Sequence, residues 1–241
     1  MLALGACATA SGIEACIGPL CVSSTVSMEP RELPAKANAP ITLSSITRVR
    51  SKEGTPPTLG SIDFMIDKNG RVNNKDFPVC TLAKLKGTTP SQARKRCAGA
   101  LVGKGTGKAL VTMPGRAPFQ ISSPISFFNA APTGGKLTLI AHAYETVPAP
   151  QALLVPIVVE RIAKGRYGFH VAVEMPEIAG GFGAATLAEA KVGATRKVNG
   201  KKVGFLGAHC SGGRLQVEGV LTFTNGDRFP TTLTSPCHTP D

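Results

Sequence analysis

The stretch that decides the fold is SIDFMIDKNGRV, residues 61–72. Ile62, Phe64 and Ile66 alternate with the residues between them, and this period of two predicts a half-buried β-strand. Asn69-Gly70 follows the strand at once. Asn-Gly is the strongest signal for a two-residue turn between strands, because both turn positions need positive φ. We therefore predict a strand, a tight turn and a second strand.

The same turn resembles part of a calcium loop. With Gly70 at the sixth position of a twelve-residue loop, side-chain oxygens fall on four ligand positions, those of Asp67, Asn69, Asn73 and Asp76. The first position, however, holds Met65, which has no oxygen, and a strand enters the loop where a helix is needed. We predict a turn here, and no metal site or cofactor anywhere in the chain.

Short β-prone runs recur along the rest of the chain. The sequence is rich in Gly (27) and Pro (19), its aromatic share is 5%, and further Asn-Gly pairs lie at 199–200 and 225–226. We count about eleven strands, a number typical of a two-sheet antiparallel β-sandwich in the all-β class. GKGTGK, residues 103–108, has the wrong spacing for a phosphate loop, and we predict a flexible turn.

One short helix is predicted over TTPSQARKRCAG, residues 88–99. Thr89 suits its N-cap, Pro90 its first turn and Gly99 its end. Cys97 near that end would pin the helix to the strand that carries Cys80. The run Arg94 to Arg96 contains no aromatic residue, so we interpret it as a solvated helix face and expect no nucleic acid as partner.

Four cysteines lie outside the first thirty residues: Cys80, Cys97, Cys210 and Cys237. An even set in a turn-rich chain predicts two disulfides. Four cysteines permit three pairings, of which we favour the local one, Cys80–Cys97 and Cys210–Cys237. A zinc site formed by Cys210 and Cys237 with His209 and His238 is disfavoured, because adjacent strand residues point to opposite faces.

Residues 1–30 contain no Lys or Arg and are small and apolar. They predict an export leader or a disordered N-terminus, followed by a Pro-rich linker over 31–40 and the β-sandwich over 41–241. Cleavage after Ala10 and lipid attachment at Cys7 both fit this segment. A lipid on Cys7 is the one membrane attachment we expect, and the location is secreted or bound to the cell envelope.

The chain is basic. Lys and Arg number 27 against 15 Asp and Glu, which gives a formal charge of +12. One basic cluster is TRKVNGKKV, residues 195–203, a predicted hairpin with Arg196, Lys197, Lys201 and Lys202 close to its turn. We take these four residues as a candidate binding site for an anionic partner, with a solvated loop tip as the alternative.

No catalytic residues are predicted. The chain has no Gly-x-Ser-x-Gly elbow, and His142, His170 and His209 lie in or beside strand-like runs without an accompanying motif. A site assembled in space from distant residues is the remaining route to an enzyme. Such a site would bring one of these histidines to a Ser or a carboxylate within a cleft.

Several motifs occur in a distinctive order: DFPVC, ALVGKGTGKA, FFN, KLTLIAHAY, YGFHVAV, GAHCSGG and LTFTNGDRFPTTLTSPC. In this order the chain, over roughly residues 40 to 237, resembles a group of uncharacterised exported proteins of high-GC Gram-positive bacteria. The resemblance implies export and a β-rich fold, and it implies no reaction. This chain departs from the group in lacking a basic start to the leader.

The sequence thus predicts a non-catalytic, exported or envelope-associated β-sandwich protein. Its expected partner is an anionic cell-envelope polymer or another protein. The alternatives are a purely structural extracellular domain and a hydrolase with a dispersed site. The oligomeric state does not follow from the sequence.

Overall fold

A computed structural model describes residues 11–240. The predicted lipid attachment at Cys7 and the stretch Ala8–Ala10 lie outside this range. Within it, none of the helices has the length and apolar character that crossing a membrane requires.

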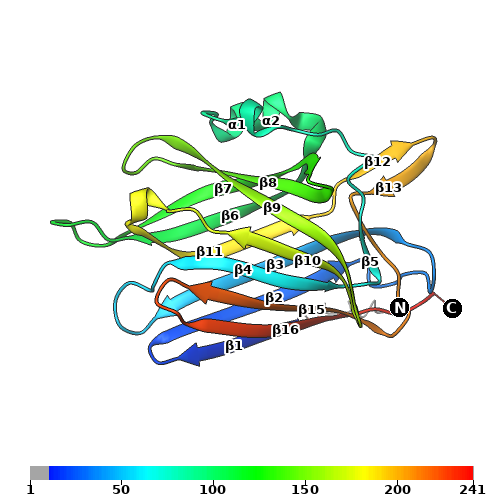
Figure 1. The fold of residues 1–241 in the computed structure, drawn as a ribbon, viewed down its shortest axis with the longest axis horizontal. Helices are drawn as coiled ribbons and strands as arrows, with labels where there is room; N and C mark the ends of the chain where they lie inside the picture. Colours follow the sequence, from blue (N-terminus) through cyan, green and yellow to red (C-terminus); the bar gives the residue numbers. More distant parts are fainter. Residues whose placement is uncertain (1–10, 241) are drawn as a thin grey trace, which may run out of the picture.

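One continuous antiparallel sheet dominates the fold (Figure 1). In spatial order its path consists of β1 (Ser11–Ile17), β2 (Leu20–Glu29), β3 (Ala39–Ser51), β11 (Gly183–Val192), β6 (Leu101–Val111), β7 (Phe119–Thr133), β8 (Lys136–Glu145), β9 (Gln151–Lys164), β10 (Tyr167–Glu174), β4 (Leu59–Asp67), β15 (Arg214–Phe223) and β16 (Arg228–Pro236). The short strands β5 (Gly70–Val72) and β14 (Leu206–Ala208) pair with each other, and β14 also pairs with β3. A separate two-stranded sheet contains β12 (Thr195–Val198) and β13 (Lys201–Gly204).

The main sheet curls until its two ends meet. The terminal strands β1 and β16 lie against each other along one side of the molecule (Figure 1). Beyond β2 and β16, the chain segments pair directly, since Leu33 N donates to His238 O at 2.9 Å and His238 N donates to Arg31 O at 3.0 Å. The all-β class is confirmed. The strands, however, form one nearly closed sheet in place of the two separate sheets predicted.

The core lies inside this curl. Apolar side chains of β8, β9 and β10 meet there with those of β4 and β6, and Phe77 packs edge-on against Phe205 with ring centroids 5.4 Å apart. A second cluster lies on the opposite face of β7 and β8, where Phe128 and Ile140 are covered by the helices. The helix layer therefore belongs to the outside of the sheet, as Figure 1 shows.

Residues 11–29 belong to the folded domain. They form β1 and β2, and β2 buries alternate side chains including Leu20, Val22 and Met28. The boundary predicted at residue 30 is wrong for this part, because small and β-branched residues such as those of β2 suit a strand as well as a leader. The predicted linker also takes part in the fold, since Leu33 is fully buried.

GKGTGK is a strand and not a turn. It lies within β6, where Gly103, Gly105 and Gly107 alternate with longer residues. A Cβ atom at Gly105 would lie 1.8 Å from the carbonyl oxygen of Glu189 on the neighbouring strand β11. Glycine is needed here for close backbone approach rather than for chain reversal.

The helix layer contains two short α-helices, α1 (Leu82–Leu85) and α2 (Pro90–Arg96), and the 3₁₀ turn η1 (Ala98–Ala100); a second 3₁₀ turn, η2 (Ala179–Gly181), precedes β11. The predicted helix is confirmed as α2, with a capping box formed by Thr89 and Gln92. Sequence reasoning missed α1, because one turn is too short to show a helical period.

Three disulfides staple the described chain. Cys80–Cys97 and Cys210–Cys237 are confirmed, which rules out the disulfide-free zinc arrangement at the second pair. The third, Cys16–Cys21, joins β1 to β2 within the segment that we predicted to be a leader. Three disulfides are typical of proteins that fold in an oxidising compartment.

The Asn69-Gly70 turn departs from the predicted hairpin. Both edges of β4 are already paired, with β10 and with β15, so β5 diverges and pairs with β14. The turn is held by Asp67, whose buried carboxylate accepts hydrogen bonds from Asn69 N at 3.1 Å, Gln216 N at 3.2 Å and Arg166 Nε at 2.9 Å. Asp67 is thus bound within the protein at the position proposed for a calcium ligand.

Candidate functional site

Positive charge is concentrated in two parts of the chain. Residues 77–144 contain nine Lys or Arg and no Asp or Glu, and residues 190–217 contain six Lys or Arg and no acidic residue. The fold brings the two parts together, because β11 pairs with β6 and places Lys191 directly opposite Lys104. In Figure 1 the helix layer covers the top of the molecule, and the hairpin β12–β13 projects at its upper right.

The hairpin β12–β13 has the predicted register. Lys197 lies opposite Lys202 and Val198 opposite Lys201, across a turn in which Asn199 and Gly200 have φ of 49° and 78°. The three lysines are exposed, and none of them forms an ion pair within residues 11–240. The tip therefore presents three unneutralised ammonium groups to solvent.

Arg196, the fourth predicted binding residue, points back to the protein. Its Nη1 donates to the carbonyl oxygen of Asp76 at 2.9 Å, and its guanidinium lies 6.0 Å from the centroid of the Phe77 ring. The structure thus separates Arg196, which anchors the hairpin, from the three lysines that face solvent.

Two buried asparagines hold the segment that anchors the hairpin. Asn129 on β7 donates through Nδ2 to the carbonyl oxygens of Asn74, Phe77 and Pro78 at 3.0, 3.0 and 3.1 Å. Asn74 donates to Asn129 Oδ1 and to the carbonyl oxygen of Ala130. This network fixes the path of residues 74–78 between the hairpin and α1, and it explains Asn129 of the FFN motif as a structural residue.

The helix layer carries a second group of exposed positive charges. We define the cationic helix layer as the exposed side chains of Val79, Leu82, Lys84, Lys86, Arg94, Lys95 and Arg96. Sequence reasoning treated the arginine run as a solvated face and missed the layer as a site. The signal that could have found it is the long interval without Asp or Glu in which the layer lies.

His142 is fully buried on β8 beneath the helices. Its Nε2 lies 3.0 Å from both the hydroxyl and the carbonyl oxygen of Thr88, and its Nδ1 is buried without a hydrogen-bond partner. Burial lowers the pKa of this histidine below its ordinary value of 6.5, which the hydrogen bond to the Thr88 backbone partly offsets. His142 therefore holds the segment between α1 and α2 through Thr88, and its ring is not exposed to solvent.

The other two histidines lie on the surface. His170 Nε2 is 3.3 Å from Asp63 Oδ1, and His209 Nδ1 is 3.1 Å from Asn38 Oδ1. Two cavities are described, one between β1 and β16 and one of about 70 Å³ inside the curl beside Met28, Ile66 and Leu233. No histidine lines either of them, so the geometry that would point to a hydrolase is not assembled at these cavities.

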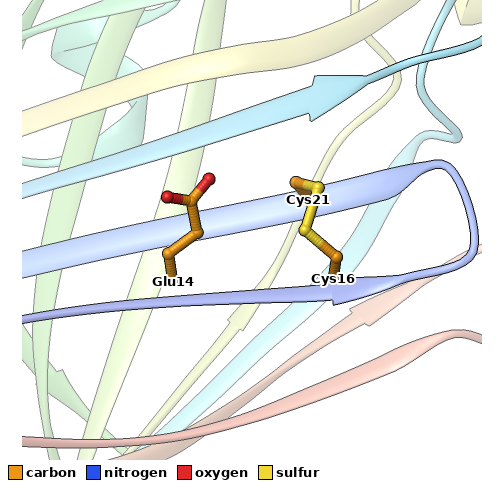
Figure 2. A group of neighbouring side chains, drawn as sticks. All are labelled: Glu14, Cys16 and Cys21. Carbon is orange, nitrogen blue, oxygen red and sulfur yellow. A yellow bond between two sulfur atoms is a disulfide. The ribbon is translucent and has the colours of Figure 1, made fainter.

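Glu14, Cys16 and Cys21 form the one close group of potential metal-ligand residues within the described chain. Figure 2 shows that the two cysteines are joined as a disulfide beside Glu14. The sulfurs are therefore not available as thiolates, and the Glu14 carboxylate is paired with Arg50. The group is explained as a stapled hairpin with a surface ion pair.

Searches of protein-family models, curated proteins and solved structures give no match to this chain.

Proposed function

We propose that this protein is an exported, non-catalytic binding domain of the cell envelope whose basic hairpin contacts an anionic surface polymer. The observation that carries the proposal is the pairing of Lys197 with Lys202 at the tip of β12–β13. Like charges directly opposite each other destabilise a strand pair. A bound polyanion would remove that cost.

The form of the hairpin supports a contact role. It is a separate two-stranded sheet, and its base is tied to the domain by Arg196 and by Ala194 N, which donates to Val102 O on β6 at 3.2 Å. A firmly held base with an exposed tip gives the lysines a defined direction. A polymer with repeated negative groups can meet several of these ammonium groups at once.

Export is supported by the disulfides. Three of them staple residues 11–240, and such a framework persists outside the reducing cytosol. The resemblance to exported proteins of high-GC Gram-positive bacteria, which rests on the sequence motifs alone, would imply the same location. A protein partner at the hairpin, a purely structural role and a hydrolase with a dispersed site are the competing hypotheses.

The experiment is retention on delipidated cell envelopes. We expect Lys197→Gln, Lys201→Gln and Lys202→Gln together to weaken retention and flatten its dependence on salt. The matched control replaces Lys36, Lys52 and Lys164 by Gln. These lysines are exposed outside the hairpin, and their replacement changes the net charge by the same amount. Equal retention of the two triple variants would contradict the hairpin as the contact, and no retention of the wild type would contradict polymer binding.

A further inference from the structure

The cationic helix layer combines positive charge with exposed apolar surface. Val79 and Leu82 are 46% and 45% exposed, and they are two of only five large hydrophobic residues exposed within the described chain. Lys84, Lys86 and the run Arg94 to Arg96 of the same layer are also exposed, and Arg96 Nη1 donates to the carbonyl oxygen of Lys84 at 3.4 Å. Exposed apolar side chains rimmed by polar and charged residues are a feature of protein and membrane interaction sites.

The exposure of these two residues is fixed by the packing beneath them. The inner side of the layer is filled by Leu85 and Ala93, which are fully buried against Phe128. The disulfide Cys80–Cys97 ties the start of the layer to its end. The inner side of the layer is thus occupied by other residues, and Val79 and Leu82 stay on its outer side.

We propose that the cationic helix layer is a peripheral contact for an anionic lipid surface. The lysines and arginines would meet lipid phosphates, and Val79 and Leu82 would enter the boundary between head groups and acyl chains. This chemistry favours a lipid over a soluble polyanion, because a polyanion in water offers no apolar phase for the two side chains. The site is distinct from the hairpin tip and does not depend on it.

Binding to vesicles of phosphatidylcholine with or without phosphatidylglycerol tests the proposal. We expect the wild type to bind only vesicles that contain phosphatidylglycerol. Val79→Ser with Leu82→Ser keeps every charge and should weaken binding about tenfold. Arg94→Gln with Lys95→Gln should weaken binding and reduce its salt dependence. Phe182→Ser, which alters an exposed apolar residue outside the layer, is the control and should leave binding unchanged.

Two results would overturn the lipid contact. One is a wild type that does not bind phosphatidylglycerol vesicles. The other is a Val79→Ser, Leu82→Ser variant that binds as well as the wild type, because the layer would then recognise charge alone, as a polymer site does. Circular dichroism confirms that each variant is folded before binding is measured. The delipidated envelopes used to test the hairpin contain no lipid. A failure of the lipid proposal and a failure of the hairpin proposal can therefore be told apart.

Discussion

Replacing Asn129 by Ala should lower the free energy of unfolding by about 3 kcal/mol. The side chain is fully buried, and its amide nitrogen faces three carbonyl oxygens at 3.0 to 3.1 Å. The nitrogen carries two hydrogens, so it supplies two hydrogen bonds shared among three acceptors, and the amide oxygen accepts a third bond from Asn74. Each is worth about 1 kcal/mol net, which sums to about 3 kcal/mol.

Urea unfolding followed by circular dichroism measures this loss with the disulfides intact. Gln120→Ala is the control, because Gln120 is exposed and its replacement should change stability by no more than about 0.5 kcal/mol. A loss below about 1 kcal/mol for Asn129→Ala would refute the reasoning, since the three carbonyls would then be satisfied without the amide. The variant should also weaken binding at the hairpin, because Asn129 holds the segment on which Arg196 rests.

Three further outcomes follow from the structure. Because burial lowers the pKa of His142, the unfolded chain binds a proton at this histidine more readily than the folded protein does. The contribution of His142 to the free energy of unfolding should be fully present above about pH 6.5 and should fall as the pH drops below that value. Urea titrations of His142→Gln should show a smaller fall. Removing the disulfide Cys80–Cys97 by replacing both cysteines with Ser should lower the free energy of unfolding by about 3 kcal/mol. In the native protein, none of the six described cysteines should react with an alkylating agent before reduction, which a measurement of intact mass would show. Calorimetry should find no calcium site tighter than about 10 µM, because Asp67 is engaged by Arg166; a tighter stoichiometric site would show that this turn can open.

Local patterns predicted the elements whose formation depends on neighbouring residues. The period of two at 62–66 marked β4, Thr89 and Pro90 marked the start of α2, and Asn199-Gly200 marked the hairpin β12–β13. In each case the determinant lies within about ten residues along the chain. The two confirmed disulfides are less local, since their cysteines lie 17 and 27 residues apart, but each still closes a single segment of the chain.

The remaining features depend on contacts between distant residues. The segment GKGTGK, residues 103–108, has the composition of a turn. Only the close approach of the Glu189 carbonyl oxygen to Gly105 shows why the strand needs glycine at that position. The closing of the sheet depends on residues 31–33 meeting His238, at opposite ends of the described chain. Arg196 contacts the domain while the three lysines face solvent. This difference depends on where Phe77 lies, which is likewise set by tertiary structure.

The most direct test of the proposed function is the salt dependence of binding to delipidated envelopes. The logarithm of the binding constant should fall linearly with the logarithm of the salt concentration. Replacing Lys197, Lys201 and Lys202 together by Gln should reduce the magnitude of that slope by about 2 to 3, since each contact with a phosphate-like group releases about one counterion. The control at Lys36, Lys52 and Lys164 should keep the wild-type slope. Equal slopes for the wild type and both triple variants would contradict the hairpin as the anionic contact.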